Sequence, residues 1–335
     1  MADLSFEHDE TGGLVSVVIP AYRADRFIGE ALESVSRQAY SNWEVIVVED
    51  GSRGATQTIV EDFARRHPSQ RIVYSRNEQN CGPSHTRNVA FSRARGEYVA
   101  FLDADDRWLP DHLAVSVDAL RTTAHDIVYS TMLMIEDRTD LVVGVWGPLS
   151  EDLSDFPYGL FRRNFINPSA TVLRRAVLAE VGAWDSELGY CHDVDFWLRC
   201  VAARKRFQHL TGVHSLYRQS HEEAVTRKTC AVLEEFAQVI ERHMHMPGLR
   251  EKTCRKHVVK AYLRAAEFHA HSDPARDPSV DPSRIAALML HAWRLRPEHV
   301  KYLWKGSVLS AVNLFRRRSR ASTSAAETSR VRAAA

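Results

Sequence analysis

Three carboxylates stand within four positions in the stretch AFLDADDRW, where Asp103, Asp105 and Asp106 directly follow an apolar run. Their mutual repulsion is unfavourable unless a positive charge offsets it. On an extended chain Asp103 and Asp105 point to the same side, so a divalent cation could relieve that repulsion. Mg²⁺ and Mn²⁺ take one or two carboxylates and complete their shell with phosphate oxygens and water. The alternative is a simple turn that starts the next helix, since so short a motif also arises by chance.

The elements that would position these aspartates are predicted from apolar runs and from apolar residues at helical spacing. Strands are expected over 14–20, 43–50, 71–76, 97–103 and 125–135. Helices are expected between them: over 56–66, from Pro83 to residue 94, after Pro110, and after the first strand. In that first helix Asp25 would be the N-cap and the apolar stripe would be Ile28, Ala31, Leu32 and Val35.

Alternation of strands and helices predicts an α/β fold with a mostly parallel sheet and helices on both faces. Ligands of such sheets bind beyond the carboxyl ends of the strands. The residues expected there are Ala21, Tyr22 and Arg23, then Glu49 to Ser52, then Asn77, and then the three aspartates. Acidic residues that are distant in sequence should therefore meet at one edge of the sheet.

After residue 135 the regular alternation of expected strands and helices ends. Residues 136–225 are mixed, with strands expected in VVGVW and SATVLR and helices near 175–181 and 193–204. From residue 226 the pattern is helical, interrupted by a proline-containing loop at 271–283. We therefore predict a leader (1–13), an α/β domain (14–225), a helical extension (226–318) and a disordered tail (319–335). The α/β domain would consist of a nucleotide-binding half (14–110) and an acceptor half (111–225).

Composition narrows the class of protein. The 335 residues are 44% hydrophobic and 26% charged, with a net charge of +1, so no basic field argues for nucleic acid. The five cysteines form no CxxC pair, which fits a reduced, cytoplasmic setting. No apolar run approaches the roughly 20 residues of a membrane span. The N-terminus lacks the basic region followed by an apolar region that is typical of a signal peptide.

The segment 300–320 allows two interpretations. Val300, Trp304, Val308, Ala311 and Phe315 share one helical stripe, and RRRSR follows at 316–320. Such a helix could lie on an anionic membrane surface, which would place the chain peripherally at the inner face of the membrane. The other interpretation is that the stripe packs on the preceding helices and the arginines are solvated.

Several motifs, in order and at familiar spacing, resemble family 2 glycosyltransferases, which have the Rossmann-like GT-A fold. VSVVIPAYRADRFIGEALESVSRQAYSNWEVIVVEDGS and NCGPSHTRNVAFSRARGEYVAFLDADD resemble that family's nucleotide-diphospho-sugar-binding half. NPSATVLRRAVLAEVGAWDSELGYCHDVDFWLR is similar to the acceptor-side segment, and YRQSH to the arginine–histidine stretch that comes after it. The resemblance covers roughly residues 14–225.

The resemblance implies a role for each matching residue on the donor side. Pro20, Ala21 and Tyr22 would line the nucleotide base, with Tyr22 against it. Asp50 would bond the base edge beside Glu49, which stands where family members often have Asp or Asn. Arg87 would reach towards base and ribose, and Asp103 would contact the ribose. Asp105 would hold the Mn²⁺ or Mg²⁺ that bridges the diphosphate, with Asp106 either shaping the metal shell or capping the next segment.

The resemblance also implies a general base. Family members usually carry Glu-Asp where this chain has His192 and Asp193, and the aspartate deprotonates the acceptor hydroxyl. The loss of one acid at His192 can alter the pKa of Asp193. The helix N-terminus would lower the basicity of Asp193, so a base role requires compensating desolvation. The alternatives are Asp195 as the base, or Asp193 as a plain helix cap.

Two further residues are implied at the phosphates. Arg218 would contact the diphosphate, and His221 the diphosphate or the metal. Here Gln219 and Ser220 both separate them, where the family usually has one intervening residue.

The function implied is a metal-dependent, inverting glycosyltransferase of polysaccharide biosynthesis. It would move a sugar from a nucleoside-diphosphate sugar, UDP-linked by expectation, to a hydroxyl of a glycan or lipid-linked acceptor. One base with no second carboxylate as nucleophile predicts a single inversion. The alternative is a catalytically impaired sugar-nucleotide or glycan-binding homologue, supported by His192. A nucleotidyltransferase or dinucleotide dehydrogenase would need a glycine-rich loop after the first strand, but no glycine precedes Gly29 there.

Overall fold

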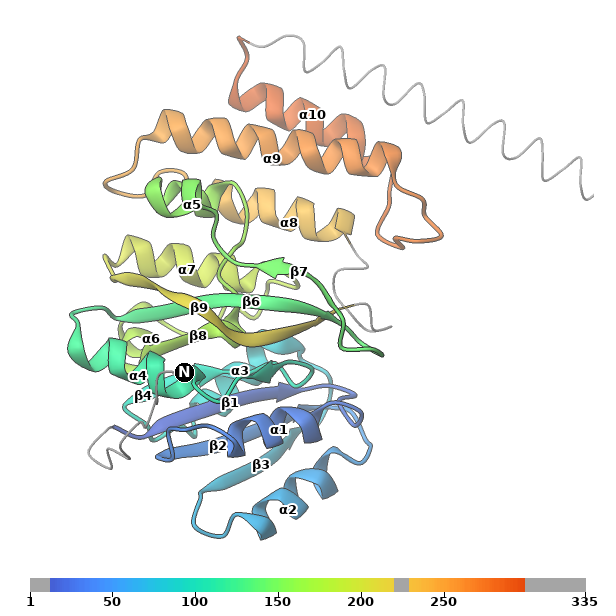
Figure 1. Ribbon diagram of the computed structural model, residues 1–335. Coiled ribbons are helices and arrows are strands. Elements are labelled where there is room, and N and C mark those ends of the chain that lie inside the picture. The colour runs from blue at the N-terminus through green and yellow to red at the C-terminus, as the bar shows by residue number, and fades with distance from the viewer. Residues whose placement is uncertain (1–12, 220–228, 299–335) are drawn as a thin grey trace, which may run out of the picture. The chain divides into compact units, whose positions relative to one another are not determined.

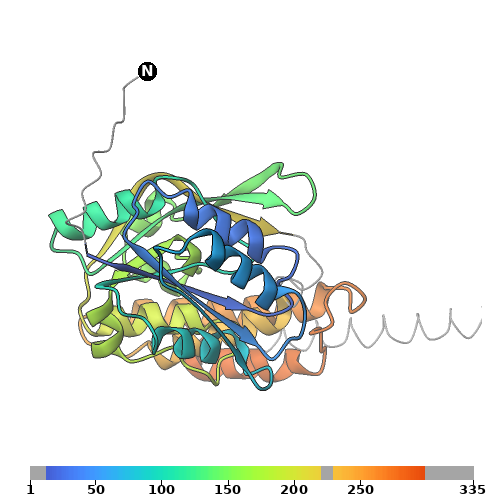
Figure 2. The same cartoon turned by 90° about the horizontal axis from the view of Figure 1, so that it is seen from below.

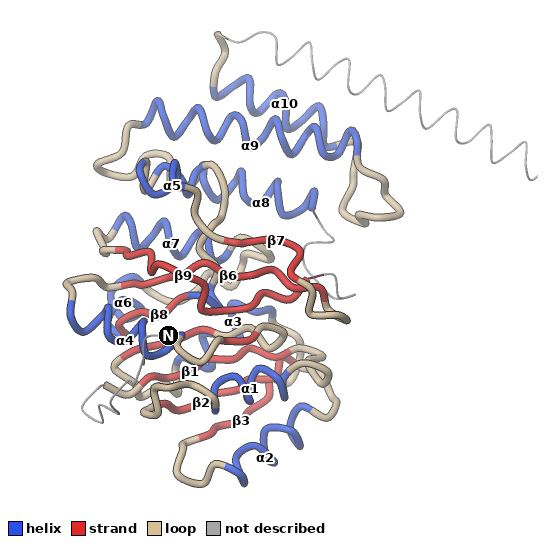
Figure 3. The backbone as a smooth tube through the Cα atoms, viewed as in Figure 1, coloured by secondary structure: helices blue, strands red, loops and turns tan. Residues whose placement is uncertain are grey.

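The computed structural model describes residues 13–219 and 229–298. The chain divides into two compact units, Met1–Ala224 and Val225–Ala335. Every described strand belongs to the first unit, and the described part of the second is helical (Figure 1, Figure 3).

The first half of the first unit alternates strands with helices, as predicted. Its four strands are mutually parallel in the order β3-β2-β1-β4. Figure 2 shows helices α1 and α2 on one side of these strands and α3 on the other. The elements are β1 (Val15–Ala21), α1 (Ile28–Ser36), β2 (Trp43–Asp50), α2 (Thr56–Arg66), β3 (Ile72–Asn77), α3 (Gly82–Phe91) and β4 (Tyr98–Phe101).

The second half of this unit extends the same sheet with mixed directions. β8 runs antiparallel between β4 and β6, β9 is parallel to β6, and β5 and β7 pair antiparallel with β9 and β6. The strands are β5 (Arg107–Trp108), β6 (Ile127–Glu136), β7 (Val142–Trp146), β8 (Thr171–Arg174) and β9 (Phe207–Gln219). The helices are α4 (His112–Thr122), α5 (Ser150–Ser154), α6 (Arg175–Val181) and α7 (His192–Ala202), with 3₁₀ turns η1 (Tyr158–Phe161) and η2 (Pro168–Ala170). The α/β fold with a mostly parallel, helix-flanked sheet is thus confirmed.

Burial of both sheet faces explains the continuous apolar runs. All eight residues of β2 are buried, and β1 is buried along almost its whole length. The acid inside β2, Glu44, accepts a hydrogen bond of 2.6 Å from Ser16 of β1 and forms an ion pair with Arg71. Edge strand β3 is only partly buried, which fits its shorter apolar run.

The prediction that Asp25 caps the first helix is wrong. Helix α1 begins at Ile28 after Phe27, without a side-chain cap. The Asp25 carboxylate instead accepts hydrogen bonds of 2.9 Å from the N–H and the hydroxyl of Thr56, the first residue of α2. The loops after β1 and β2 meet at one sheet edge, and there Asp25 supplies an acceptor for an N–H in the first turn of α2.

The second unit contains α8 (Thr229–Arg242), α9 (Glu251–His271) and α10 (Arg284–Leu295). Helix α9 packs against both of the others. Glu234 of α8 bonds His269 of α9 and Arg284 of α10, both at 2.6 Å. The predicted loop with three prolines lies between α9 and α10.

Several sequence-based expectations fall outside the described residues. These are most of the leader, His221, the stripe and arginines of 300–320, and the tail. In the described ranges, no helix combines the length and the apolar composition that crossing a bilayer requires.

Candidate active site

The three aspartates form a tight turn at the end of β4. Strand β4 ends at Phe101, and the Asp106 N–H donates to the Asp103 carbonyl at 3.0 Å. The chain is therefore not extended here, and the expectation that Asp103 and Asp105 point the same way by strand alternation does not apply. The turn does lie at the carboxyl edge of the parallel strands, as expected.

Two arginines from distant parts of the chain offset the charge of this turn. Arg87 of α3, with only 4% of its side chain exposed, forms an ion pair with Asp103. Arg218 of β9 donates its backbone N–H to the Asp106 carboxylate at 3.1 Å and its Nε to the Asp105 carbonyl at 3.0 Å. The turn is therefore held on both sides before any metal ion binds.

The rest of the Arg218 guanidinium is also engaged. Its Nη2 bonds Glu30 of α1 at 2.6 Å, its Nη1 bonds the Asp137 carbonyl at 3.1 Å, and it lies over the Phe27 ring at 5.0 Å. Only 3% of the side chain is exposed. Arg218 braces the aspartate turn here, and its contact with a diphosphate stays a prediction.

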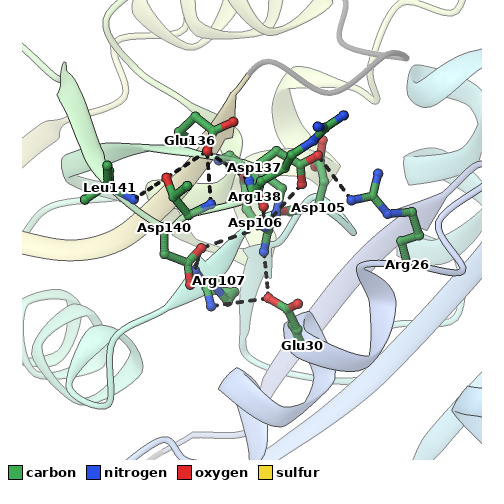
Figure 4. Close-up of polar contacts among 12 residues, drawn as sticks. Arg26, Glu30, Asp105, Asp106, Arg107, Glu136, Asp137, Arg138, Asp140 and Leu141 are labelled. Carbon is green, nitrogen blue, oxygen red and sulfur yellow. Dashed lines mark hydrogen bonds and ion pairs between the residues drawn. The ribbon is translucent and has the colours of Figure 1, made fainter.

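The tip of the β6–β7 hairpin completes this network (Figure 4). Arg107 pairs with Glu30 at 3.2 Å and with Asp140 at 2.7 Å, while Arg26 pairs with Asp137 at 3.2 Å. The Asp140 N–H also donates to the Glu136 carbonyl at 3.0 Å. The hairpin tip is thus fastened to α1 and to the aspartate turn.

Asp106 is enclosed by protein. It is 1% exposed, and burial together with the charges of Asp105 and Asp103 raises its pKa well above the usual value. This enclosure disfavours the expected role in a metal shell. The hydrogen bond that the carboxylate accepts comes from Arg218 of β9 and not from the segment that follows Asp106, so the expected capping role stays a prediction.

Asp50 anchors the start of α3. Its carboxylate accepts hydrogen bonds from the side chain of Asn77 at 2.9 Å and from the N–H groups of Cys81 and Gly82, both at 2.8 Å. The chain turns directly after it at Gly51, with φ of 71°, where a Cβ would lie 2.3 Å from the backbone of Gln79. Asp50 thereby positions the helix that carries Arg87.

Glu49 is also held by protein groups. It is fully buried and accepts the Ser52 hydroxyl at 2.7 Å, Arg76 at 3.1 Å and the Tyr74 hydroxyl. Burial and the Glu49 charge raise the pKa of Tyr74 to about 12. Contacts of Glu49 and Asp50 with a nucleotide base stay predictions.

Pro20, Ala21 and Tyr22 continue β1 to the same edge, where Ala21 pairs with Glu49. Tyr22 is 42% exposed, and the Arg23 guanidinium lies 5.2 Å from its ring centroid. One aromatic ring is therefore accessible where the family resemblance implies a residue that lies against the nucleotide base.

Asp193 lies in the first turn of α7. Its carboxylate accepts hydrogen bonds from Asn164 Nδ2 at 2.5 Å and from the Val194 N–H at 2.8 Å. Burial raises the pKa of Asp193 to about 6, against the opposing effects of these two hydrogen bonds and of Arg87. The desolvation that a base role requires is therefore present.

Asp195 has a different environment on the same helix. It is 5% exposed and pairs with Arg199 at 2.8 Å. Arg199 also donates to the carbonyls of Val181 at 3.1 Å and Ala183 at 2.8 Å. This geometry disfavours Asp195 as the base and gives it a structural role.

His192 connects the two sides of the site. Its Nε2 lies 2.8 Å from Arg87 Nη1, and a guanidinium only donates, so Nε2 accepts and Nδ1 carries the proton. Burial and the Arg87 charge lower the pKa of His192 well below the usual value, so the ring is neutral. Arg87 thus joins Asp103 to the helix that carries Asp193, with its guanidinium 5.3 Å from the Trp184 ring.

Comparison with known proteins agrees with this geometry. The sequence model of glycosyl transferase family 2 matches residues 16–182. Over these residues the chain belongs to glycosyl transferase family 2.

Two relatives in this family have informative names. TuaG of Bacillus subtilis (strain 168), named for glycosyl transfer in teichuronic acid biosynthesis, is 37% identical over 145 residues, 42% of this chain and 56% of TuaG. WfgD of Escherichia coli, named as a UDP-Glc:alpha-D-GlcNAc-diphosphoundecaprenol beta-1,3-glucosyltransferase, is 32% identical over 126 residues, 38% of this chain and 48% of WfgD. The chain thus spans about half the length of these relatives.

Two solved structures share the fold at low sequence identity. TarS 1-349 of S. aureus in complex with UDP-GlcNAc has a TM-score of 0.60 and 21% identity, covering 91% of this chain and 92% of that one. The mannosyltransferase PcManGT of Pyrobaculum calidifontis in complex with GDP-Man and Mn²⁺ has a TM-score of 0.57 and 19% identity, covering 90% and 86%.

The fit of a divalent metal to this family 2 site rests on Asp105. It is a partly exposed carboxylate at the tip of the turn. Residues 13–219 and 229–298 contain no group of three His, Cys, Asp or Glu side chains that could hold a metal ion. Mg²⁺ and Mn²⁺ accept a single carboxylate when substrate phosphates and water fill the shell. The residues therefore fit a metal ion whose remaining ligands are phosphate oxygens and water, and Asp105 as its protein ligand stays a prediction.

Sequence reasoning missed several residues of this family 2 site. Asn164 holds Asp193, and the Ser169 hydroxyl accepts the Asp103 N–H at 3.0 Å. Burial and the charges of four aspartates, Asp106 first, raise the pKa of Tyr217, which packs edge-on against Trp146 at 5.9 Å. The available signals were weak: Asn164 precedes the NPSA motif, Ser169 lies within it, and Tyr217 precedes Arg218.

Proposed function

We propose that the chain transfers a sugar from a UDP-sugar to a hydroxyl of a glycan or lipid-linked acceptor, with inversion at the anomeric carbon. The observation that carries the proposal is Asp193. It is a carboxyl with a pKa of about 6, near the Arg87–Asp103 pair. The names of WfgD and of the TarS complex support a UDP-linked donor.

On the donor side the proposal assigns the exposed Tyr22 ring to the base. The Arg87–Asp103 pair would meet the ribose, and Asp105 would face the diphosphate. A Mn²⁺ or Mg²⁺ ion held by Asp105 would supply positive charge for the leaving nucleoside diphosphate. The Mn²⁺ in the PcManGT complex supports this choice of metal.

On the acceptor side Asp193 removes the proton of the attacking hydroxyl as that oxygen bonds to the anomeric carbon. The bond from this carbon to the diphosphate oxygen breaks on the opposite face, and the carboxyl retains the proton. Asn164 orients the carboxylate through its hydrogen bond. With no second carboxylate acting as nucleophile, a single displacement inverts the configuration.

The second candidate, an impaired sugar-nucleotide-binding homologue, has one observation in its favour. His192 stands where the family usually has an acid, and it is buried and neutral. Asp193 nevertheless retains both its environment and its raised pKa. Transfer therefore remains the better supported function.

The test is a thermal-shift panel of UDP, GDP, dTDP and CDP, each with and without Mn²⁺. Binding to the native state raises apparent stability in proportion to RT ln(1 + [L]/Kd). We expect a metal-dependent shift with UDP that disappears in Asp105→Ala. A matched control is Asp118→Ala on α4, a carboxylate with 65% of its side chain exposed.

Three outcomes separate the possibilities. A UDP shift accompanied by UDP release from UDP-sugars in the presence of acceptor supports transfer. A shift without any release across a panel of donors and acceptors supports the binding homologue. The absence of a shift with every nucleotide, in folded protein, contradicts the whole donor assignment.

A further inference from the structure

Helix α9 of the second unit carries a line of positive side chains on its exposed face. Lys252, Lys256, Lys260 and Arg264, here called the basic row, follow one another at intervals of four residues, and all four are exposed. Residues four apart lie one above the other on the same face of a helix. At a rise of about 1.5 Å per residue, neighbours in the row are about 6 Å apart along the helix axis.

The use of lysine sets this row apart from the rest of the chain. The first 204 residues contain no lysine, and three of the seven lysines in the sequence stand in the basic row. The positive charges of the candidate active site come from arginines, Arg87 and Arg218, which hold carboxylates in a fixed geometry. Lysine instead presents a point charge on a flexible stem. The row is therefore suited to attract negative charge without fixing one partner in one orientation.

The basic row has no acidic partner in the described structure. No ion pair joins any of its three lysines to another described residue, and the Arg264 guanidinium lies 5.7 Å from the centroid of the Phe268 ring. Five lysines and arginines stand on α9 against two glutamates. One of these, Glu251, is already paired with Arg255. The positive charge of the row is therefore available to a ligand.

Repulsion within the row opposes the stability of its own helix. Like charges four residues apart destabilise a helix, and the row contains three such pairs in succession. Lys252 also stands in the first turn, where the helix dipole favours negative charge. A helix face that only meets water usually interleaves both signs, as Glu251 and Arg255 do at the start of α9. The row thus lacks a structural reason within the helix, and a bound polyanion would offset its repulsion.

The rest of α9 favours a linear polyanion over a bilayer as that ligand. A helix that lies on a membrane combines basic residues with exposed apolar side chains, which enter the interface. On α9 the apolar residues Val258, Val259 and Tyr262 are buried, and no large apolar side chain of the helix is exposed. Figure 1 shows α9 between α8 and α10, against which it packs. A single line of charges without apolar neighbours complements a chain of negative groups.

We propose that the basic row of α9 binds an acidic glycan chain, one that carries carboxylate or phosphate groups along its length, as the acceptor of sugar transfer. The proposal rests on the proposed function and narrows its acceptor class. Because both units belong to one chain, a polymer held by the second unit stays at a high effective concentration for the first.

The test is fluorescence anisotropy of two end-labelled polymers, polygalacturonate and inorganic polyphosphate, titrated with the full chain. The wild type should bind at least one of them at low salt, and added salt should weaken the binding. Binding of the first alone identifies carboxylate as the recognised group, and binding of the second alone identifies phosphate. No binding of either polymer overturns the proposal.

The decisive variant is Lys252→Gln/Lys256→Gln/Lys260→Gln, which removes three charges and keeps a residue of similar helix propensity. We expect its Kd for the polymer to rise at least tenfold. Replacing the same three lysines by arginine keeps the charge and should leave Kd within about threefold of the wild type. A glutamine variant that binds like the wild type overturns the proposal and places the contact elsewhere.

The matched control is Arg37→Gln/Arg95→Gln/Arg175→Gln, at three exposed positions of the first unit. It lowers the net charge by the same amount as the glutamine variant and should bind the polymer like the wild type. Labelled neutral dextran should bind none of these proteins. An equal loss of polymer binding in both triple variants would mean that only net charge matters, which also overturns the proposal.

Flotation with vesicles separates the polymer from a membrane. The same variants are mixed with vesicles of phosphatidylcholine and phosphatidylglycerol. If the row binds these vesicles but neither polymer, it is a membrane contact and the proposal fails.

The UDP-induced thermal shift keeps this proposal distinct from the proposed function. It is measured on the same proteins and should be unchanged in the glutamine variant. Polymer binding through the row, with no shift for any nucleotide, sinks the proposed function and leaves the polyanion site standing. A UDP shift with no polymer binding overturns the polyanion site alone.

Discussion

The carboxylates on the two sides of the site differ in how they are held. On the donor side, Asp50 accepts three hydrogen bonds, and the Asp103–Asp106 turn is braced by Arg87 and Arg218. On the acceptor side, Asp193 has one side-chain donor, Asn164, together with the N–H of its own neighbour.

Under the proposed function, this difference matches the separate tasks of binding the donor and taking up a proton. Several donors around a carboxylate stabilise its charge and fix its position, which suits groups that shape a ligand site. Burial with few donors raises proton affinity, which suits a group that must take up a proton near neutral pH. Under the proposed function, the same side-chain type would thus serve two purposes in one site.

The largest expected effect comes from Asp193→Asn. The amide keeps the size of the side chain but cannot accept a proton, so kcat should fall by about 10²–10⁴-fold. The UDP-induced thermal shift should remain, because donor-side contacts are untouched. The measurement is UDP release with acceptor present. A rate within threefold of the wild type would place the base elsewhere.

Asp50→Ala should mainly change stability. It leaves the N–H groups of Cys81 and Gly82 without their acceptor, which should lower the free energy of unfolding by about 2–4 kcal/mol. Asp50→Asn is the control and should cost less, because one carbonyl oxygen remains. Urea denaturation measures both. Equal stability of all three proteins would refute the anchoring role.

Asp195→Asn sharpens the comparison within α7. Its ion pair with Arg199 is structural, so the variant should lose about 1–2 kcal/mol of stability while its transfer rate stays within about threefold. The readouts are urea denaturation and UDP release. A loss of rate similar to that of Asp193→Asn would mean that both carboxylates take part in the chemistry.

The smallest expected effect is a shift in pH dependence. Only the ionised Asp193 accepts a proton, so the wild-type rate should rise through pH of about 6 and then level off. His192→Glu adds a negative charge and engages Arg87, so this limb should move up by about one pH unit or less. His192→Gln, which stays neutral, should leave it in place. If the rise of the rate with pH stays at the same pH in His192→Glu, the charge at position 192 does not influence the pKa of Asp193.

The raised pKa of Asp193 also makes the stability of the folded protein depend on pH, in the direction opposite to that of the transfer rate. Because the folded protein binds the Asp193 proton more tightly than the unfolded chain, the stabilising contribution of this carboxyl is present at low pH. It is lost as pH rises from the ordinary value of 3.8 through about 6. Rate and stability should therefore move in opposite directions over this window, and Asp193→Asn should remove both trends.

The N-terminal strands and helices could be predicted because their signals are local. Continuous apolar runs mark β1 and β2, and the helix expected over 56–66 has the bounds of α2. The meeting of Tyr22, Asp50 and the aspartate turn at one edge follows from parallel strand direction alone. Residue patterns and elementary topology are sufficient for this part.

The partners of the polar groups could not be predicted in the same way. Asp25 has the sequence position of a cap for α1, yet it bonds Thr56 of α2. Arg218 and Asn164 reach their carboxylates from β9 and from the loop after η1. Strand β9, with histidines, a glycine and a bulged register, lacks a clear apolar pattern. Such choices depend on tertiary geometry that no local pattern encodes.

The Arg218 brace has a consequence for synthesis of the chain. Its contacts with Asp106 and Glu30 span 112 and 188 residues. Contacts of such separation form late and slow the acquisition of structure. A nascent chain emerges from the ribosome N-terminus first, so β1 to β4 can assemble while the aspartate turn still lacks its second support. The aspartate turn is complete only after β9 has been translated, so its formation requires synthesis of nearly the whole first unit.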